Sequence, residues 1–451
     1  MRSPNGPTRS RYSTSCVSSK RNSHTRNAPR AAHLASRCAL LIVLLLGVLA
    51  VQPVGALCAP TSVDRRVSAI PARVLLTAPP ERLIDTRRQL ASQRLRRYDR
   101  PLFILWALSQ ITAFFALWTG GYAARLREAV RRRVRHPFVM RFALGALLAY
   151  IAGLASFPAS FAHWRVDLAL GTALETSASW VRDGFVNATV DAVVVGVVVA
   201  AIFALVDRTR LWWAYATVGL FGVTLLLAFL EPITVAPLYN RIRPLPLHAA
   251  IRKPLDALAA RAGIVGAPLE VSDTSRRSRA IAADIAGVGP TKRIVLGDEL
   301  LADATQGEVL FLASREFGHY AHADDFRLSL FWTFLFIVAT AAAVLMADRI
   351  PFRRDDDPLA RLPLVFALMG IGGLVLTPVY NAYSRNLESR ADAYGLALAG
   401  NRAAAVRAYV RIADETLAPL CPSRAVRLYF YNSPPLGTRI AKAAQHRNPC
   451  P

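Results

Sequence analysis

Seven long apolar stretches constrain this chain of 451 residues more than any other feature. Each carries few charges and is about 17–20 residues long, close to what a helix needs to cross a hydrocarbon core. One such stretch could be a buried helix of a soluble protein, but seven in a chain with 53% hydrophobic residues predict an α-helical polytopic membrane protein. The stretches are Ala39–Ala56, Leu102–Trp118, Phe142–Phe161, Ala188–Val206, Trp212–Leu230, Ser329–Ala347 and Pro363–Tyr380.

The charge of the chain is strongly basic. It has 55 basic and 30 acidic residues, a net charge of +25. Nucleic-acid binding is one interpretation of such an excess. However, arginines cluster beside the apolar stretches, and the basic segment Ala124–His136 directly follows one of them. This is the flank expected of a cytoplasmic loop, so we assign the excess to membrane orientation and expect no nucleic-acid partner.

The N-terminal part has a different composition. Met1–Arg37 is rich in Ser, Asn, Pro and Arg and contains no acidic residue, so we expect 1–38 to be a disordered basic segment. The apolar residues 39–57 are either a signal peptide, cut after Ala56 by the small-residue rule, or the first transmembrane helix. The sequence leaves both interpretations open.

Hydropathy divides the rest of the chain into parts. An amphipathic helical pattern and two short strand patterns, Leu269–Asp273 and Arg293–Asp298, fall where hydropathy drops. Cys421 and Cys450 form a disulfide if their end of the chain is extracytoplasmic, and unlinked thiols are the open alternative. We expect transmembrane helices over 81–236, a water-exposed domain over 237–328, two transmembrane helices over 329–380 and a C-terminal helical part over 381–451.

Two short motifs carry candidate chemistry. A helix expected over Gln306–Phe326 contains Arg315, Glu316 and His319, the spacing of the zinc-protease motif H-E-x-x-H with arginine in place of the first histidine. Further on, Glu388 and Asp392 share one face of a polar helix. A zinc site of the gluzincin kind takes its third ligand from such a Glu, with the Asp behind it. Local ion pairs on a solvated helix are the alternative, but both motifs in this order favour a site.

Further segments resemble a known family. "LEPITVAPLYNRIRPLP", "EVLFLASREFGH", "NAYSRNLESRADAYGLALA" and "PPLGTRI" are similar to segments of the integral-membrane zinc metalloproteases of the CAAX prenyl protease 1 type. The resemblance runs from about residue 81 to 445. It implies about seven transmembrane helices around a chamber, capped by a gluzincin-like α+β zinc-protease domain. It also implies zinc as the cofactor, a peptide or lipidated protein as substrate, and contact with membrane lipids.

The resemblance also assigns roles to residues at the metal. It places the first zinc ligand at Arg315, the second at His319 and the third at Glu388. Asp392 would stand behind the metal, and Glu316 would be the general base.

Two further positions depart from the family pattern near the substrate. Ala282 begins Ala-Ala-Asp where the family has Asn-Ala-Tyr on the strand that holds the substrate backbone. Ser433 stands where the family has a histidine just before Pro-Pro, whereas Arg439 is kept.

Arginine at position 315 is a serious change for a metal site. Its guanidinium stays protonated and offers no lone pair, so His319 and Glu388 leave zinc one ligand short of three. We hypothesise that Arg315 pairs with Asp392 or Glu388, and with Glu316, as an internal substitute for the metal. Two other histidines could replace the missing ligand: His322, which we expect one turn too far along the helix, and His163, which we expect in a loop between spans.

Three functions remain open from the sequence. The chain is a catalytically silent protease homologue that still binds peptides, an active zinc endopeptidase with a variant site, or a membrane scaffold without enzymatic function. We expect a multi-pass protein of a bacterial inner membrane. The basic segment puts the protease-like domain outside the cytoplasm, whereas the family resemblance puts it inside, and the sequence does not choose between them.

Overall fold

The structure is a computed structural model that describes residues 63–264, 266–287, 291–351 and 358–450. The expectations for 1–38 and 39–57 fall outside these residues.

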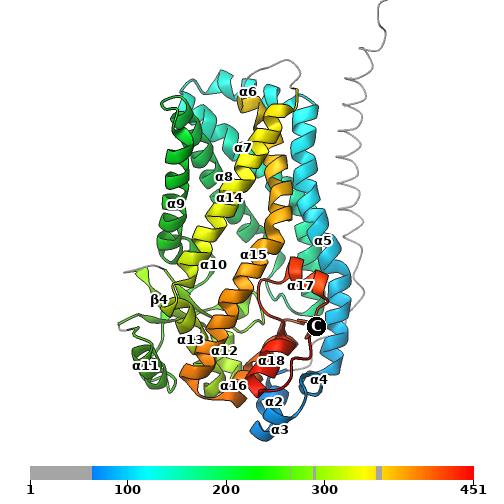
Figure 1. The fold of residues 1–451 in the computed structure, drawn as a ribbon, viewed down its shortest axis with the longest axis vertical. Coiled ribbons are helices and arrows are strands. Elements are labelled where there is room, and N and C mark those ends of the chain that lie inside the picture. The colour runs from blue at the N-terminus through cyan, green and yellow to red at the C-terminus, as the bar shows by residue number, and fades with distance from the viewer. Residues whose placement is uncertain (1–62, 265, 288–290, 352–357, 451) are drawn as a thin grey trace, which may run out of the picture.

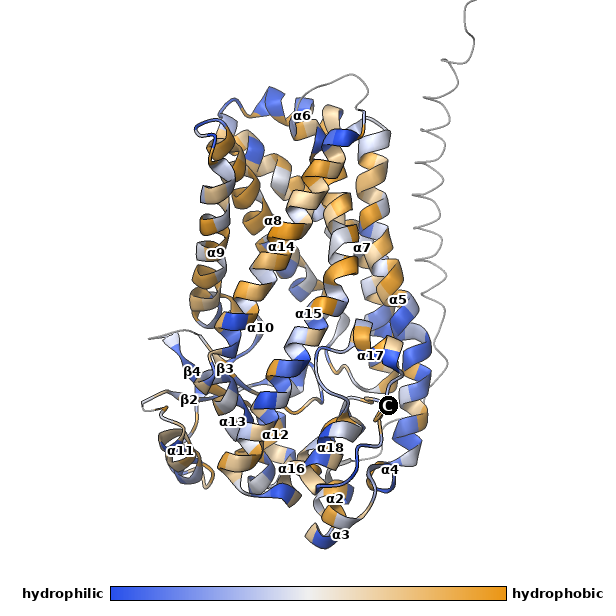
Figure 2. Cartoon of the chain, viewed as in Figure 1, coloured by the Kyte–Doolittle hydropathy of each residue, from blue (hydrophilic) through white to orange (hydrophobic). Residues whose placement is uncertain are grey.

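Six helices of the described residues are long and apolar enough to cross a membrane, and each contains one of the predicted stretches. They stand side by side as a bundle, with apolar residues through its middle and hydrophilic residues at both ends (Figures 1 and 2). The prediction of a helical polytopic membrane protein is confirmed. The helices are α5 (Thr86–Thr119), α7 (Pro137–Leu170), α8 (Ser177–Val206), α9 (Trp212–Leu230), α14 (Asp324–Arg349) and α15 (Leu362–Ala399).

Glycines allow two of these helices to approach closely. A Cβ on Gly145 of α7 would lie 3.1 Å from the Cα of Gly196 in α8, and a Cβ on Gly196 would lie 2.8 Å from the Phe142 ring. Close backbone approach of this kind commonly drives helix association in membranes. Lipid tails are as apolar as the side chains, so the hydrophobic effect does not hold the helices together and close packing must do so.

One end of the bundle carries an α+β domain, which we call the site end (Figure 1). Its four-stranded sheet has the order β1-β2-β4-β3, with β2 and β4 parallel and the other pairs antiparallel. Both predicted strands are present as β2 and β4. The strands are β1 (Ile242–Pro244), β2 (Leu269–Ser272), β3 (Ala283–Ala286) and β4 (Arg293–Gly297), and the helices beside them are α11 (Arg252–Arg261), α12 (Asp298–Asp303) and α13 (Gln306–Ala321).

The core of the site end joins segments that are far apart in the sequence. Phe311 and Phe317 of α13 are fully buried in one cluster with Leu296 of β4, Val67 near the start of the described chain and Tyr409. The helices that contribute from the two ends of the chain are α2 (Val63–Ser68), α3 (Ala72–Thr77), α4 (Pro80–Leu83), α16 (Arg402–Glu415) and α18 (Leu436–Ala444).

The opposite end of the bundle carries α6 (Tyr122–Arg133), and we call it the arginine end (Figure 1). The remaining short elements are a π-helical turn (Glu231–Val235), α10 (Ala236–Tyr239), two 3-10 turns (Thr274–Arg276 and Pro358–Arg361) and α17 (Arg424–Phe430).

Two expected boundaries differ from the structure. The last span and the polar helix after it are one continuous helix, α15, which passes residue 380 without a break despite Pro378. Asn381 helps to hold this region, because its amide donates to the Tyr429 carbonyl at 2.7 Å. In the same way α14 begins at Asp324, before the predicted start of the span at 329. Polar residues extend both helices beyond the apolar stretch that the sequence pattern detects.

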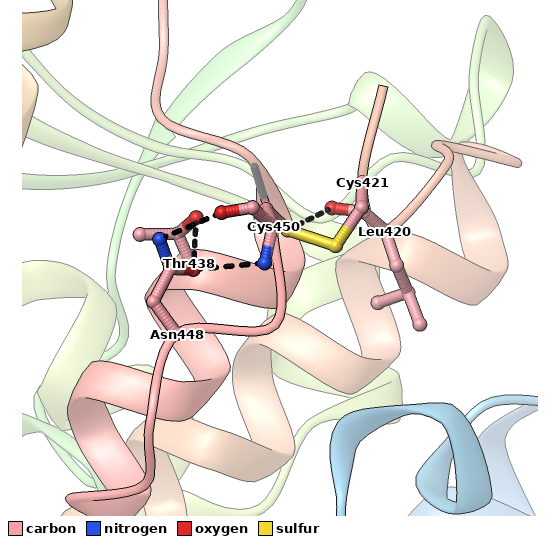
Figure 3. The surroundings of a disulfide bond; sticks show 5 residues. All are labelled: Leu420, Cys421, Thr438, Asn448 and Cys450. Atoms are coloured by element: carbon pink, nitrogen blue, oxygen red, sulfur yellow. Dashed lines mark hydrogen bonds between the residues drawn. A yellow bond between two sulfur atoms is a disulfide. The ribbon is translucent and has the colours of Figure 1, made fainter. Parts of the chain in front are cut away.

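Of the two possibilities left open for Cys421 and Cys450, a disulfide or two unlinked thiols, the structure contains the disulfide. Cys421 and Cys450 form a disulfide that closes the C-terminal end of the chain onto the segment before α17 (Figure 3).

Candidate functional site

The helix that carries the degenerate motif, α13, is fixed at its first turn. Thr305 and Glu308 form a capping box, in which the Thr305 backbone N–H and hydroxyl both donate to Glu308 at 2.7 Å. Glu308 also pairs with Arg411 of α16 at 2.9 Å, and both side chains are fully buried. Arg411 in turn donates to the Ser68 hydroxyl at 2.8 Å. The start of α13 is therefore tied to both ends of the chain.

Two glycines bring α13 against α15. A Cβ on Gly395 would lie 3.0 Å from the backbone of Arg315, and a Cβ on Gly318 would lie 3.0 Å from the Cβ of Tyr394. Neither position has room for a side chain without a shift of its neighbours. This close contact places Arg315 directly opposite the two acidic residues of α15.

Arg315 lies among three carboxyl groups. Its Nε donates to Asp392 at 3.1 Å, and its two terminal nitrogens contact Glu316 and Glu388. The side chain is only 15% exposed. Arg439 of α18 donates to the same Asp392 oxygen at 2.6 Å. The predicted pairing of Arg315 is confirmed, and it includes both Asp392 and Glu388 as well as Glu316.

His319 still faces Glu388. Its Nε2 lies 3.6 Å from Glu388 Oε1, and its Nδ1 lies 3.1 Å from Asp324 Oδ2. Asp324 is buried and also contacts Arg390 of α15. The sequence analysis missed Asp324 and Arg390. Asp324 follows a turn at Ala323, whose φ of 51° reverses the chain and brings the carboxylate back to the histidine five residues earlier.

Burial is the largest influence on the two ionisable groups at the centre. It raises the pKa of Glu316 to about 8, helped by nearby negative charges and opposed by Arg315. Burial lowers the pKa of Arg315, but the three carboxyl groups raise it by more, so the net shift is upward. At neutral pH, Arg315 is therefore charged and the protonated form of Glu316 predominates.

These residues do not fit a zinc ion. A catalytic zinc takes three protein ligands, and here only His319 and Glu388 offer lone pairs from the ligand positions while the Arg315 guanidinium lies against Glu388. Over the described parts of the chain, no group of three or more His, Cys, Asp or Glu side chains could hold a metal ion.

The two histidines considered as replacement ligands make other contacts. His322 Nδ1 lies 2.7 Å from the Gly318 carbonyl of its own helix. His163 lies on α7, not in the predicted loop, with its Nε2 at 3.1 Å from Asp99 and 3.6 Å from Asp167. The prediction of a loop at His163 was wrong because α7 extends beyond its apolar stretch to Leu170.

The remaining predicted site residues divide into two groups. Arg439 lies in the cluster through its contact with Asp392. Ala282 immediately precedes β3, the last strand in the sheet order, and its carbonyl accepts from the Gly297 N–H at 2.9 Å. Ser433 is half-buried in the loop before α18, and its hydroxyl donates to Asn432 at 3.5 Å.

Comparison with known proteins covers nearly the whole described chain. Residues 247–447 match peptidase family M48, and residues 74–241 match the CAAX prenyl protease N-terminal domain of five membrane helices. The uncharacterized metalloprotease YhfN of Bacillus subtilis is 27% identical over 390 residues, which are 84% of this chain and 91% of that protein.

Other relatives are eukaryotic. The probable CAAX prenyl protease 1 of Schizosaccharomyces pombe is 29% identical over 257 residues, 55% of this chain and 52% of that protein. The crystal structure of S. mikatae Ste24p superposes with a TM-score of 0.69 at 20% identity, covering 93% of this chain and 99% of that one, and shows the shared fold. The chain therefore belongs to the family of integral-membrane zinc metalloproteases of the CAAX prenyl protease type.

Proposed function

We propose that this chain is a catalytically silent member of its protease family, which binds polypeptide segments at the membrane without cutting them. The observation that carries the proposal is the position of Arg315. Its guanidinium contacts the residue at the third ligand position, Glu388, and the residue at the general-base position, Glu316. One side chain thus engages two of the groups on which hydrolysis in this family would depend.

Both the metal and the general base lose their role in hydrolysis under this proposal. When bound in an enzyme of this kind, zinc polarises the scissile carbonyl and activates a water molecule. Glu316 would have to accept a proton from that water, but a pKa raised to about 8 by burial keeps it protonated at neutral pH. Arg315 adds a fixed positive charge, which repels a divalent cation.

The strand that would hold a polypeptide is present, although its Ala282-Ala283-Asp284 departs from the family pattern. β3 stands at the end of the sheet order and packs beside α13, so an extended segment could add to its free side as a further strand. Peptides, lipidated chains or membrane proteins are the ligands proposed here, in contact with membrane lipids. We place the protein in a bacterial inner membrane because its relative YhfN is bacterial.

An active zinc endopeptidase with a variant site is the second candidate. The observation in its favour is that His319 and Glu388 still face one another, at 3.6 Å, with Asp324 behind the histidine. An arginine that left this position would uncover two of the three ligands.

Zinc content separates the two candidates. We expect detergent-purified natural protein to hold no zinc by elemental analysis, and the Arg315→His variant to hold about one zinc per chain, since metal binding needs only the missing ligand. Arg132→His, on an exposed arginine of α6, is the matched control and should hold none.

Cleavage of a lipidated peptide, with and without a chelator, is measured on the same samples, together with photo-crosslinking of that peptide. The proposal expects crosslinking without cleavage by the natural protein. About one zinc per chain in the natural protein, with cleavage that the chelator abolishes, would overturn it. No crosslinking at all would instead favour the scaffold interpretation.

A further inference from the structure

The two ends of the helical bundle differ in the arginine content of their short loops. At the arginine end, six arginines lie within 121–136 and two within 207–211, and Arg349 and Arg361 flank the connection between α14 and α15. At the site end, the short loop 171–176 between α7 and α8 contains no basic residue. Arginine in short loops marks the cytoplasmic side, whereas long domains carry little information on orientation.

The arginines of the α6 loop are displayed to solvent. The side chains of Arg131 and Arg132 are 66% and 78% exposed. Helix α6 lies across the arginine end of the bundle, on the side opposite the sheet (Figure 1). Arg131 and Arg132 both pair with Glu128 of the same helix and remain exposed, so their positive charge stays at the surface of the short loop that joins α5 to α7.

Two arginines in the first half of α5, which lies at the site end, contact the folded domain there. Arg88 is buried and donates to the Asp414 carbonyl of α16. Arg96 pairs with Asp99 and donates to the Leu417 carbonyl at 3.5 Å. Arg88 and Arg96 are therefore part of the folded site-end domain, whereas Arg87, Arg94 and Arg97 of the same helix are exposed, so we take the orientation signal from the short loops alone.

The disulfide gives an independent indication at the site end. Cys421 and Cys450 are bonded across a sequence separation of 29, beside the first turn of α18 (Figure 3). A Cβ on Gly437 would meet both sulfur atoms within 2.9 Å. Asn448 accepts from the Cys450 N–H at 3.1 Å and from the Thr438 hydroxyl at 2.9 Å, so the last residues form a closed, ordered loop. Structural disulfides persist in oxidising compartments and are rare in the cytosol.

The N-terminal sequence agrees with both observations. Residues 1–38 contain seven arginines, one lysine and no acidic residue, a composition that stays in the cytoplasm. Whether 39–57 is a cleaved signal peptide or a transmembrane helix, the chain after it begins on the far side of the membrane. That side is the site end, because α2 packs against α16 there.

We propose that the site end, with the Arg315 cluster, faces the oxidising, extracytoplasmic side of the membrane. The polypeptides that reach the site are then exported chains or extracytoplasmic segments of membrane proteins, not lipidated chains of the cytosol. The choice of ligand rests on the proposed function, whereas the orientation stands without it.

Labelling of single cysteines in the full chain tests the orientation. Cys16, Cys38 and Cys58 are replaced by serine, the disulfide is kept, and either Arg132→Cys at the arginine end or Lys442→Cys, at an exposed position of the otherwise buried α18, is added. Spheroplasts of a bacterial host are treated with a membrane-impermeant maleimide. We expect Lys442→Cys to be labelled in intact spheroplasts, and Arg132→Cys only after lysis.

A second measurement covers the case in which a variant fails to fold. In cells carrying the natural chain, free thiols are blocked before lysis, and the C-terminal peptides are mapped without reduction. The proposal expects Cys421 and Cys450 to be found joined. Blocked, unlinked thiols at both positions, or labelling of Arg132→Cys from outside, would overturn it.

The labelling results test the orientation separately from the proposed function. Inverted labelling refutes the orientation whether or not the protein binds zinc or peptide. If labelling is as expected, peptide crosslinking from the outer face of spheroplasts tests the ligand class. Crosslinking only in inverted vesicles would refute that class, and its absence from both faces would count against the proposed function instead.

Discussion

Removal of the Arg315 side-chain charge should destabilise the protein strongly. At neutral pH, Glu316 is mostly protonated, so the cluster balances the cations Arg315 and Arg439 against the carboxylates Glu388 and Asp392. In Arg315→Met, which keeps the length of the side chain, one carboxylate is left without a cation in a mostly buried site. Loss of one partner of a buried pair costs about 3–5 kcal/mol.

If the uncompensated carboxylate causes the loss of stability, a second substitution that removes this carboxylate should restore part of it. Because Glu388→Gln removes the carboxylate that Arg315 contacts, the double variant should recover part of the loss, with a coupling energy of about 1–3 kcal/mol.

Equilibrium unfolding in mixed detergent micelles, followed by tryptophan fluorescence, measures these free energies. Arg132→Met is the control, because that side chain is 78% exposed and its ion pair with Glu128 should contribute less than about 1 kcal/mol. The reasoning is refuted if Arg315→Met unfolds within about 0.5 kcal/mol of the natural protein at pH 8 and shows no coupling to Glu388→Gln.

Three further predictions concern metal, redox state and pH. Zinc at a hundred times its dissociation constant should stabilise Arg315→His by about 2.7 kcal/mol and leave the natural protein unchanged, which thermal unfolding with and without chelator would show. Reduction of the Cys421–Cys450 disulfide, with a sequence separation of 29, should lower the free energy of unfolding by about 3–4 kcal/mol, and equal stability in oxidised and reduced samples would contradict this. Burial and the hydrogen bond with Asp303 raise the pKa of Glu299 to about 7 in the folded state, above its ordinary value of about 4.3. The contribution of Glu299 to the free energy of unfolding is therefore fully present below pH ~4.3 and is lost as the pH rises through 7. Glu299→Gln should therefore stabilise the protein at pH 8, by at most about 1 kcal/mol after solvent screening, and have little effect at pH 4; a pH-independent difference would show that the titration is not the cause.

The membrane part of the fold was largely predictable from the sequence. Lipid forces the backbone to satisfy its own hydrogen bonds, so each span must be a continuous apolar helix, and six predicted stretches became six helices. The lengths of these helices were not predictable in the same way. Polar extensions such as Thr86–Arg100 of α5 and the second half of α15 have no contact with lipid tails to mark them as helix.

The site was predictable where chemistry is local. Arg315 offers donors to carboxyl groups, and the two motifs named which carboxyl groups were near. The Glu308–Arg411 pair, whose partners are 103 positions apart in the sequence, has no local sequence pattern that predicts it. The contact of Asp324 with His319 depends on a left-handed turn at alanine, a conformation that this residue type does not signal.

The tie between the two ends of the chain has a consequence for how the protein is made. Ser68 hydrogen-bonds to Arg411 across 343 residues, and Arg66 pairs with Asp414 across 348. Every transmembrane helix of the described chain lies between these partners, so α2 has no α16 to pack against until the last span has left the ribosome. The two segments must come together before their contacts can form, and the entropy lost on closing a loop of this length slows the docking of α2 on α16. The site-end core therefore forms after synthesis of the membrane part, and a chain truncated before α16 should stay inserted but leave α2 and α13 open to proteases and chaperones.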